Sequence, residues 1–176
     1  MRDRLSKVLL IAIALSTMGL LITGCASNSN GSPSSPVTVG SEAPDFTLSD
    51  LDGESVSLSD FSGRPVFVNF WNTGCPPCRE EMPYLQEVYD SQMGSELVML
   101  IVNIGESPAT ITTFLENNDL SLPIIIDADG AVARTYGLSG IPTTFFIDRD
   151  GIIKSKVIGA FPSKAAIDSR LSEIMH

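Results

Sequence analysis

The chain alternates between short apolar segments and longer amphipathic ones. Two apolar runs rich in β-branched and aromatic residues, at 65–71 and 97–104, predict buried central strands. Shorter runs of the same kind predict three more strands, at 124–126, 144–147 and 152–158. Helices are predicted from Cys75 onward and at 108–117, 131–136 and 163–174, the last with Ser163 as its N-cap.

Two turn sequences indicate how some of these strands pair. Short β-prone segments at 45–48 and 54–58 flank Leu51-Asp52-Gly53 and predict a small N-terminal β-hairpin. The turn at 148–151, which ends in Asp-Gly, predicts that the last two strands are antiparallel. Strands that alternate with helices and close with such a pair are typical of an α/β domain, with a central mixed sheet and helices on both faces.

The first 24 residues carry a different pattern. Residues 2–7 include three basic side chains and precede an apolar run of 15 residues, Val8–Ile22. That run is short for a membrane-spanning helix and suits the core of an export signal. It ends in L-I-T-G-C, which resembles the bacterial lipobox and implies cleavage before Cys25 and acylation of Cys25. The acyl chains would anchor the protein to a membrane without spanning it. A plain secretory signal with a chance cysteine is the alternative.

The segment after this leader has the composition of a linker. Ser, Asn, Gly and Pro dominate residues 25–38, as in flexible tethers. We therefore divide the chain into a lipoprotein signal peptide at 1–24, a tether at 25–38 and a folded domain at 39–176. Export places that domain outside the cytoplasm, where disulfide bonds persist.

Composition agrees with an ordinary globular domain. The 176 residues are 43% hydrophobic and 18% charged, with a formal net charge of −10. From Cys25 onward the chain has 8 basic and 20 acidic residues, a net charge of −12. The acidic residues are spread along the sequence, which indicates a soluble acidic surface. Nucleic acid is excluded as a partner, because binding it requires a basic face.

Most of the candidate chemistry lies in W-N-T-G-C-P-P-C-R at 71–79, where two prolines separate Cys75 from Cys78. The chain has three cysteines in all, and its one histidine is the last residue. A structural zinc site needs four N or S ligands, and a copper site would have Met82 nearby but no histidine, so metal binding is a weak alternative. A purely structural disulfide is another, but closing so short a loop removes little chain entropy.

Redox chemistry suits the cysteine pair better. Cys75 stands at the N-terminus of a predicted helix, where free N–H groups and the helix dipole favour a thiolate. Cys78 lies one turn further on and can resolve a mixed disulfide formed at Cys75. Pro76 and Pro77 have no N–H groups to stabilise that thiolate. Because fewer donors favour a more reducing couple, we expect a reductase rather than an oxidant.

The wider sequence resembles a known family. The motif at 71–79 is followed downstream by G-I-P-T-T-F-F-I-D at 140–148, as in thioredoxin-fold proteins. Four further segments resemble the membrane-anchored TlpA/ResA group of extracytoplasmic thiol–disulfide oxidoreductases: A-P-D-F-T-L at 43–48, V-N-F-W at 68–71, E-E-M-P at 80–83 and V-N-I-G-E-S at 102–107. The resemblance spans about residues 40 to 175 and implies a thioredoxin-like fold for the folded domain.

The resemblance also implies roles for individual residues. Cys75 would be the attacking nucleophile, Cys78 the buried resolving cysteine, and Pro142 a cis-proline that faces the disulfide. The alternative for Pro142 is an ordinary proline at a strand start. Backbone beside Pro142 would pair with a substrate peptide through main-chain hydrogen bonds. The predicted substrate-binding residues flank these positions: Trp71, Ile141 and Thr143.

Two glutamates are candidates for tuning the thiols. Glu81 lies three residues after Cys78 on the same helix face, and the resemblance gives a glutamate at this place a part in the acid–base behaviour of the thiols. The alternative is an acid early in a helix that complements the dipole. Glu106 is the second candidate, or it simply begins the next helix. Cytoplasmic thioredoxins carry a buried aspartate where this chain has Asn69, which shifts proton transfer to Glu81 or to water.

The sequence therefore predicts a lipid-anchored, extracytoplasmic thiol–disulfide oxidoreductase that is monomeric and uses no cofactor or metal. Its substrates would be disulfides of secreted proteins, with apocytochrome c among those the resemblance implies, and a membrane thiol reductase would supply electrons. A peroxiredoxin-like thiol peroxidase and a non-enzymatic copper-binding protein of the same fold are the alternatives. The peroxidase motif P-x-x-x-[ST]-x-x-C is missing, since Val68 and Asn72 stand at its first two defined positions before Cys75.

Overall fold

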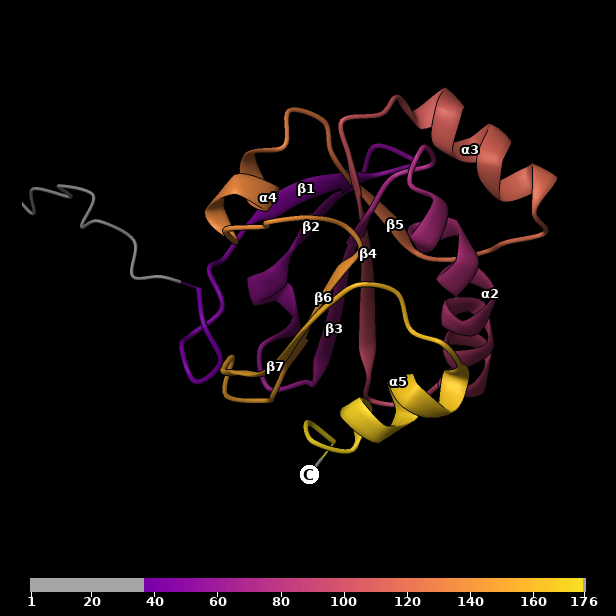
Figure 1. The fold of residues 1–176 in the computed structure, drawn as a ribbon. Coiled ribbons are helices and arrows are strands. Elements are labelled where there is room, and N and C mark those ends of the chain that lie inside the picture. Colours follow the sequence, from indigo (N-terminus) through magenta and orange to yellow (C-terminus); the bar gives the residue numbers. More distant parts are fainter. Residues whose placement is uncertain (1–36, 176) are drawn as a thin grey trace, which may run out of the picture. The chain divides into compact units, whose positions relative to one another are not determined.

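Residues 37–175 are described by the computed structural model, and the predicted signal peptide, Cys25 and most of the predicted tether lie outside them. Within this range the chain forms one seven-stranded sheet with helices on both sides (Figure 1). The predicted α/β class is thereby confirmed. None of the helices between residues 37 and 175 is long and apolar enough to cross a membrane.

The sheet is mixed, as predicted. In chain order its strands are β1 (Thr47–Asp50), β2 (Ser55–Ser57), β3 (Val66–Trp71), β4 (Val98–Ile104), β5 (Ile124–Asp127), β6 (Thr143–Ile147) and β7 (Ile153–Ile158). Their spatial order is β2-β1-β5-β4-β3-β6-β7. The β3–β4 and β4–β5 pairs are parallel, while β6 runs antiparallel to both β3 and β7.

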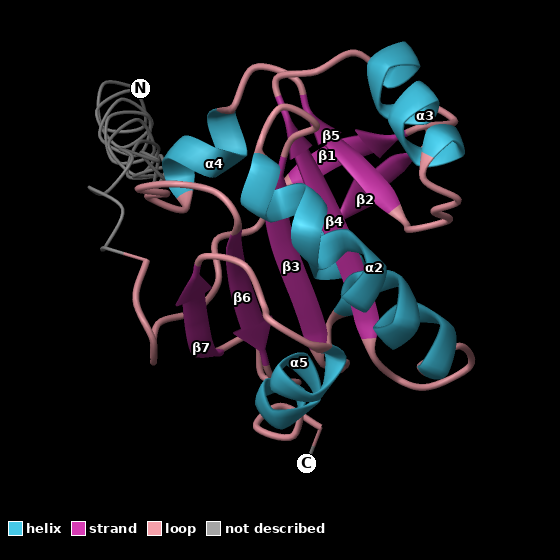
Figure 2. Ribbon diagram, turned by 45° about the vertical axis from the view of Figure 1, so that its right-hand side comes forward, coloured by secondary structure: helices cyan, strands magenta, loops and turns pink. Residues whose placement is uncertain are grey.

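The helices divide between the two faces of the sheet (Figure 2). They are α2 (Pro76–Ser91), α3 (Pro108–Asn117), α4 (Ala131–Thr135) and α5 (Lys164–Leu171), with a 3-10 helix, η1 (Leu58–Phe61). Helices α2, α3 and α5 pack on one face and α4 and η1 on the other. Every residue of β3 is buried, which explains why this strand reads as a continuous apolar run.

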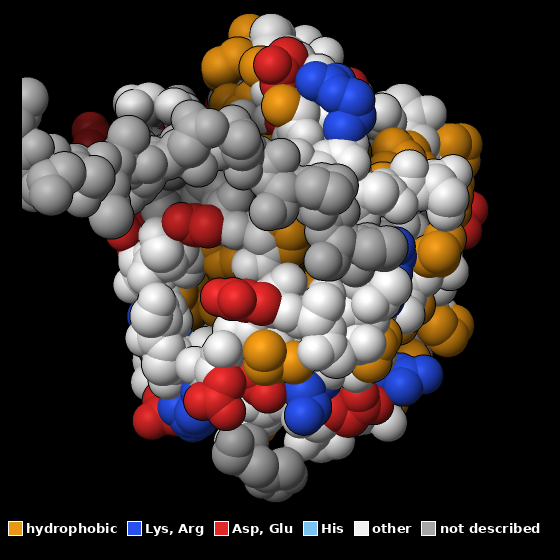
Figure 3. Space-filling view, turned by 90° about the vertical axis from the view of Figure 1, so that its left-hand side faces the viewer, with side chains coloured by type: hydrophobic (Ala, Val, Ile, Leu, Met, Phe, Trp, Pro, Cys, Tyr) orange, Lys and Arg blue, Asp and Glu red, His pale blue; other side chains and the backbone are white. Residues whose placement is uncertain are grey.

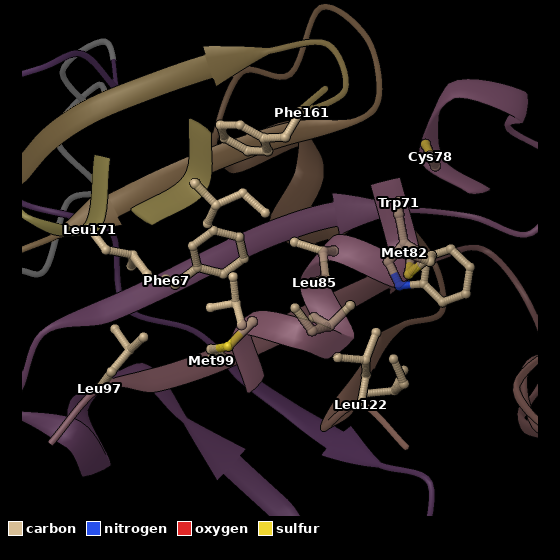
Figure 4. Close-up of a cluster of buried hydrophobic side chains, with 14 of the residues drawn as sticks. Phe67, Trp71, Cys78, Met82, Leu85, Leu97, Met99, Leu122, Phe161 and Leu171 are labelled. Atoms are coloured by element: carbon tan, nitrogen blue, oxygen red, sulfur yellow. The ribbon is translucent and has the colours of Figure 1, made fainter. Parts of the chain in front are cut away.

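Two cores result, one on each face. The core under α2 contains Phe67, Leu85 and Phe146, and Figure 4 shows Phe67 and Leu85 among the side chains that fill it. The core on the opposite face is aromatic, because Tyr136 packs against Phe145 with ring centroids 5.0 Å apart. The Tyr136 hydroxyl donates to the Pro44 carbonyl oxygen at 2.7 Å, so its polar end is satisfied.

Most predicted boundaries differ from the observed ones by a few residues. The N-terminal hairpin is confirmed, but the predicted second strand is too long at its C-terminal end, because Leu58 begins η1. There the Asp60 carboxylate accepts from the Ser57 N–H at 2.8 Å and starts the 3-10 turn. The last helix ends at Leu171, earlier than predicted, while its N-cap is confirmed by the Ser163 side chain, which accepts from Ala166 N–H.

Charge is scattered over the surface rather than concentrated. On the face that Figure 3 shows, acidic side chains lie apart from one another, and several near the lower edge lie beside basic ones. Surface ion pairs such as Lys164–Asp168 connect neighbouring positions and contribute little stability each. On this face the acidic residues are spread out, as they are along the sequence.

Leu85 offers a direct test of the core under α2. Its side chain is fully buried, so we expect Leu85→Ala to lower the free energy of unfolding by about 2–5 kcal/mol. Guanidinium denaturation of the oxidised domain measures this loss. Met93→Ala is the matched control, because Met93 is 73% exposed, and it should change stability by less than about 0.5 kcal/mol. Equal effects of the two substitutions would contradict the assignment of this core.

Candidate active site

The candidate site lies at one edge of the sheet, where three chain segments meet. Because β3 and β4 are parallel, their C-terminal ends lie at the same edge, and antiparallel β6 begins there. The register pairs Trp71 with Asn103 and Phe70 with Thr143. The residues that follow β3, follow β4 and precede β6 are therefore brought together, although they are far apart in sequence.

Cys75 and Cys78 form a disulfide at the start of α2. Cys75 is the N-cap, and its Sγ accepts from the backbone N–H of Cys78 at 3.2 Å. Pro76 and Pro77 occupy the two preceding helical positions and have no N–H to offer. Cys75 is 8% exposed and Cys78 is fully buried, so Cys75 is the more accessible of the two cysteines. This asymmetry agrees with the predicted attacking and resolving roles.

The segment before β6 lies against the disulfide. The Ile141–Pro142 bond is cis, which confirms that prediction. The Ile141 carbonyl oxygen is 3.7 Å from Cys75 Sγ, close enough to accept from the thiol once the disulfide is reduced. The Pro142 carbonyl accepts from Gly159 N–H at 2.8 Å, which connects this segment to the end of β7.

The three predicted substrate-binding residues differ in how accessible they are. Ile141 is partly exposed beside Cys75. Trp71 and Thr143 are fully buried, since Trp71 packs on Phe114 with ring centroids 5.3 Å apart and Thr143 donates to a backbone carbonyl. Figure 4 shows Trp71 next to Met82 in the core. In this oxidised form a substrate can touch the Ile141 side chain, whereas Trp71 and Thr143 shape the site from within.

Glu81 is an acid inside the core. It lies three residues after Cys78 on α2 and is fully buried, while neighbouring Glu80 is exposed. Its carboxylate accepts from Asn69 Nδ2 and from Phe161 N–H, each at 2.9 Å. Burial raises the pKa of Glu81 to about 7, and these two hydrogen bonds partly offset that rise. Glu81 is therefore able to take up and release a proton near neutral pH.

Asn69 connects Glu81 to the sheet. Its amide nitrogen donates both to Glu81 and to Thr144 Oγ1, the latter at 2.9 Å. Its amide oxygen is buried, and no hydrogen-bond donor among the described residues reaches it. The Asn69 amide does not ionise near neutral pH, so Glu81 is the titratable member of this network.

Glu106 lies in the turn between β4 and α3. Its carboxylate accepts from Thr73 N–H at 2.8 Å, from Thr73 Oγ1 at 2.5 Å and from Asn103 Nδ2 at 2.7 Å. Glu106 therefore does more than precede α3, whose N-cap is Ser107. Its partner Thr73 stands two residues before Cys75.

Sequence reasoning missed the partners of both glutamates. Phe161 is 80 residues from Glu81 and contributes a backbone N–H, so its identity carries no signal of that contact. Thr73 and Asn103 lie within motifs that the sequence analysis noted, but the motifs alone do not show which donor meets which acceptor. Within residues 37–175, no three His, Cys, Asp or Glu side chains are grouped as metal ligands, and Met82 is buried in the core.

The chain is similar in sequence to known proteins. Residues 39–156 match the AhpC/TSA family. The chain is 44% identical over 138 residues to the thiol-disulfide oxidoreductase ResA of Geobacillus thermodenitrificans (strain NG80-2), which covers 78% of this chain and 79% of that protein. It is 37% identical over 123 residues to ResA of Bacillus subtilis (strain 168), which covers 70% and 69% of the two chains.

Solved structures agree with the sequence matches. The crystal structure of StoA from Bacillus subtilis is similar with a TM-score of 0.65 and 26% identity, over 78% of this chain and 98% of that one. A thiol:disulfide interchange protein of the thioredoxin family from Chlorobium tepidum TLS is similar with a TM-score of 0.69 and 25% identity, over 79% and 99%. The predicted thioredoxin-like fold is thereby confirmed. From these matches and the Cys75–Cys78 disulfide, we conclude that the chain belongs to the AhpC/TSA family and is a thiol–disulfide oxidoreductase of the ResA type.

Proposed function

We propose that the protein reduces disulfides of exported proteins through Cys75 and Cys78, while anchored to the outer surface of a membrane by a lipid on Cys25. One observation carries the catalytic part of this proposal. Cys75 is the more accessible residue of the disulfide, and its sulfur accepts a single backbone N–H from the start of α2. Support for the anchor comes from the sequence of residues 1–25, which lie outside the described structure.

The proposed reaction has two exchange steps. In the first, the Cys75 thiolate attacks a sulfur of the partner's disulfide, forms a mixed disulfide and releases one partner thiolate. In the second, the Cys78 thiolate attacks Cys75 Sγ and releases the other partner thiolate. The partner gains two electrons and the enzyme loses two, ending as the Cys75–Cys78 disulfide. A membrane thiol reductase then returns two electrons to the enzyme.

Glu81 supplies the proton acceptor for the second step. Cys78 is fully buried, so its thiol loses its proton only if a nearby group accepts it. Glu81 lies one helical turn away, where side chains are neighbours, and its pKa of about 7 matches a base that works near neutral pH. The proton on Glu81 can afterwards pass to the departing partner thiolate or to water.

The prolines favour the reducing direction. A thiolate at a helix N-cap is stabilised by the first free N–H groups of the helix. Here the first two positions are prolines, so Cys78 N–H is the first donor available to Cys75. A less stabilised thiolate makes the dithiol form less favourable and the couple more reducing. Disulfides of secreted proteins, including the haem-attachment cysteines of apocytochrome c, are the substrates we propose.

Trapping the mixed disulfide tests the division of labour between the cysteines. Cys78→Ser should stop the reaction after the first step, because Cys75 attacks and nothing resolves the product. We expect a stable adduct with a disulfide-containing peptide by intact mass, while Cys75→Ser should give none. Turnover should fall to background in both variants. An adduct on Cys78 instead, or peroxide consumption faster than disulfide reduction by the unmodified protein, would contradict the proposal.

The reduction potential tests the direction. We expect a potential near or below about −270 mV, the value for thioredoxin, when the described domain is equilibrated with glutathione and dithiothreitol. The fraction oxidised is read by thiol alkylation and mass. A potential near about −120 mV, as in strong oxidants, would make the protein an oxidase and overturn the argument from the prolines.

Glu81→Gln tests the buried acid through stability and rate. A pKa raised in the folded state means that the unfolded chain loses the Glu81 proton first, so stability falls as pH rises from about 4.5 to about 7. Relative to the Gln variant, the unmodified protein should lose about 3 kcal/mol of unfolding free energy as the pH rises through that window. Denaturation of the oxidised form measures this loss.

The same variant should also slow the second exchange step. We expect a loss of about 100-fold in resolution of a preformed mixed disulfide, and loss of the inflection near pH 7 in its pH profile. Glu80→Gln is the control, because Glu80 is exposed and should show neither change. A pH profile that keeps its inflection in Glu81→Gln would remove Glu81 from the mechanism.

A further inference from the structure

The loop that precedes Cys75 is held by few hydrogen bonds of its own. Residues 72–74, called here the active-site loop, connect the end of β3 to the N-cap of α2. Gly74 has no side chain that could pack against the rest of the protein and restrain the loop. Even a Cβ at this position would contact a single atom, 3.6 Å away and within the loop itself. The turn that ends the loop is closed by one hydrogen bond, from Cys75 N–H to the Asn72 carbonyl, at 3.3 Å. The two prolines that follow add no donors.

One side chain ties this loop to the sheet. Both donors of Thr73, its N–H and its hydroxyl, go to the Glu106 carboxylate, as given above. Asn103, the cross-strand neighbour of Trp71, donates a hydrogen bond to the same carboxylate. Among the described residues, Glu106 is the one side chain outside the active-site loop that forms a hydrogen bond with a residue of that loop. Three donors that converge on one carboxylate also fix its orientation, because each carboxylate oxygen accepts along defined directions.

The Asn103 amide is oriented for this purpose. Its nitrogen faces Glu106, and its fully buried oxygen has no donor within the described part of the chain. The opposite amide orientation would turn the oxygen toward the carboxylate and leave Glu106 without this donor. The observed orientation therefore keeps Asn103 as a hydrogen-bond donor to Glu106.

We infer that Glu106 is a positioning residue that holds Cys75 over Cys78 when the disulfide is open. In the oxidised form the S–S bond itself keeps the two sulfurs together. Reduction adds two electrons and two protons and breaks that bond. The hydrogen bonds between Thr73 and Glu106 are then the main restraint on the active-site loop. The held geometry raises the effective concentration of one thiol at the other, which favours closure of the disulfide. Glu106 therefore makes the couple more reducing.

This inference rests on thiol–disulfide exchange at Cys75 and Cys78, and not on the substrates or the membrane location proposed above. A rival explanation for any effect of Glu106 is its charge, since a carboxylate near Cys75 disfavours the thiolate. Glu106→Gln separates the two. A Gln amide oxygen can accept from Thr73 N–H and Asn103, and its NH₂ can donate to the Thr73 hydroxyl, so the contacts survive while the charge is lost.

The experiment measures, for the full-length protein, the equilibrium of the Cys75–Cys78 pair with glutathione. In Glu106→Ala, the equilibrium constant for closing the disulfide should fall about tenfold, which is about 30 mV. Glu106→Gln should stay within about twofold of the unmodified protein, because its contacts are kept. Thr73→Val, which keeps the backbone donor and loses the hydroxyl, should fall by about threefold. Glu80→Ala removes an exposed carboxylate from α2 and should have no effect.

Two results would overturn the inference. The first is an equilibrium constant for Glu106→Ala equal to that of the unmodified protein. The second is an equal shift in Glu106→Gln and Glu106→Ala, with the Cys75 thiolate appearing at lower pH in both by its absorbance, which would assign the effect to charge. If Glu106→Ala does not fold by circular dichroism, Thr73→Val decides, and no shift there would overturn the inference. A potential that is high in all variants would count against the proposed reductase direction and leave the role of Glu106 standing.

Discussion

The pairing of β3 between β4 and β6 is the constraint on which the site depends. Parallel pairing on one side and antiparallel pairing on the other bring two strand ends and one strand start to the same edge. Thr73 and Glu106 are 33 residues apart, and Cys75 and Ile141 are 66 residues apart, yet each pair is in contact. A slip of one residue in either register would turn the alternating side chains of β3 to the wrong faces. Such a slip would take Asn69 away from Glu81 and Thr144, so the hydrogen bonds of this one polar side chain of β3 depend on the observed register.

The site uses its buried polar groups in two different ways. Glu81 is placed where ionisation is unfavourable, which raises its pKa to about 7. Glu106 is half-buried and surrounded by three donors, an arrangement that suits an acceptor with a structural task. Two acids of the same chemistry thus take different parts, one in proton transfer and one in geometry, because their surroundings differ. The arrangement at Glu81 costs stability, because it places an acid in the core.

Much of the fold was predictable from local pattern. The apolar runs at 65–71 and 97–104 became β3 and β4, and the helix at 108–117 was predicted with its observed bounds. Prediction was weaker where a capping interaction decides the end of a strand. At Leu58 the chain begins a 3-10 helix, because the Asp60 carboxylate accepts from the Ser57 N–H. Within the site, the disulfide partners and the cis bond before Pro142 were predicted from motifs. The burial of Trp71 and Thr143 was not, since motif position does not show which side of the sheet a side chain fills.

The sequence by itself determined the chemistry: two cysteines separated by prolines, a helix that begins between them, and an acid one turn further on. Each of these is local, because spacing along a helix fixes which side chains are neighbours. Tertiary structure alone decided which groups those side chains contact. Phe161 N–H and Asn69 meet Glu81, Glu106 meets Thr73, and the Ile141 carbonyl meets Cys75 Sγ. These contacts join segments from different strands and loops, and several use backbone groups, which every residue carries and which therefore leave no trace in the sequence.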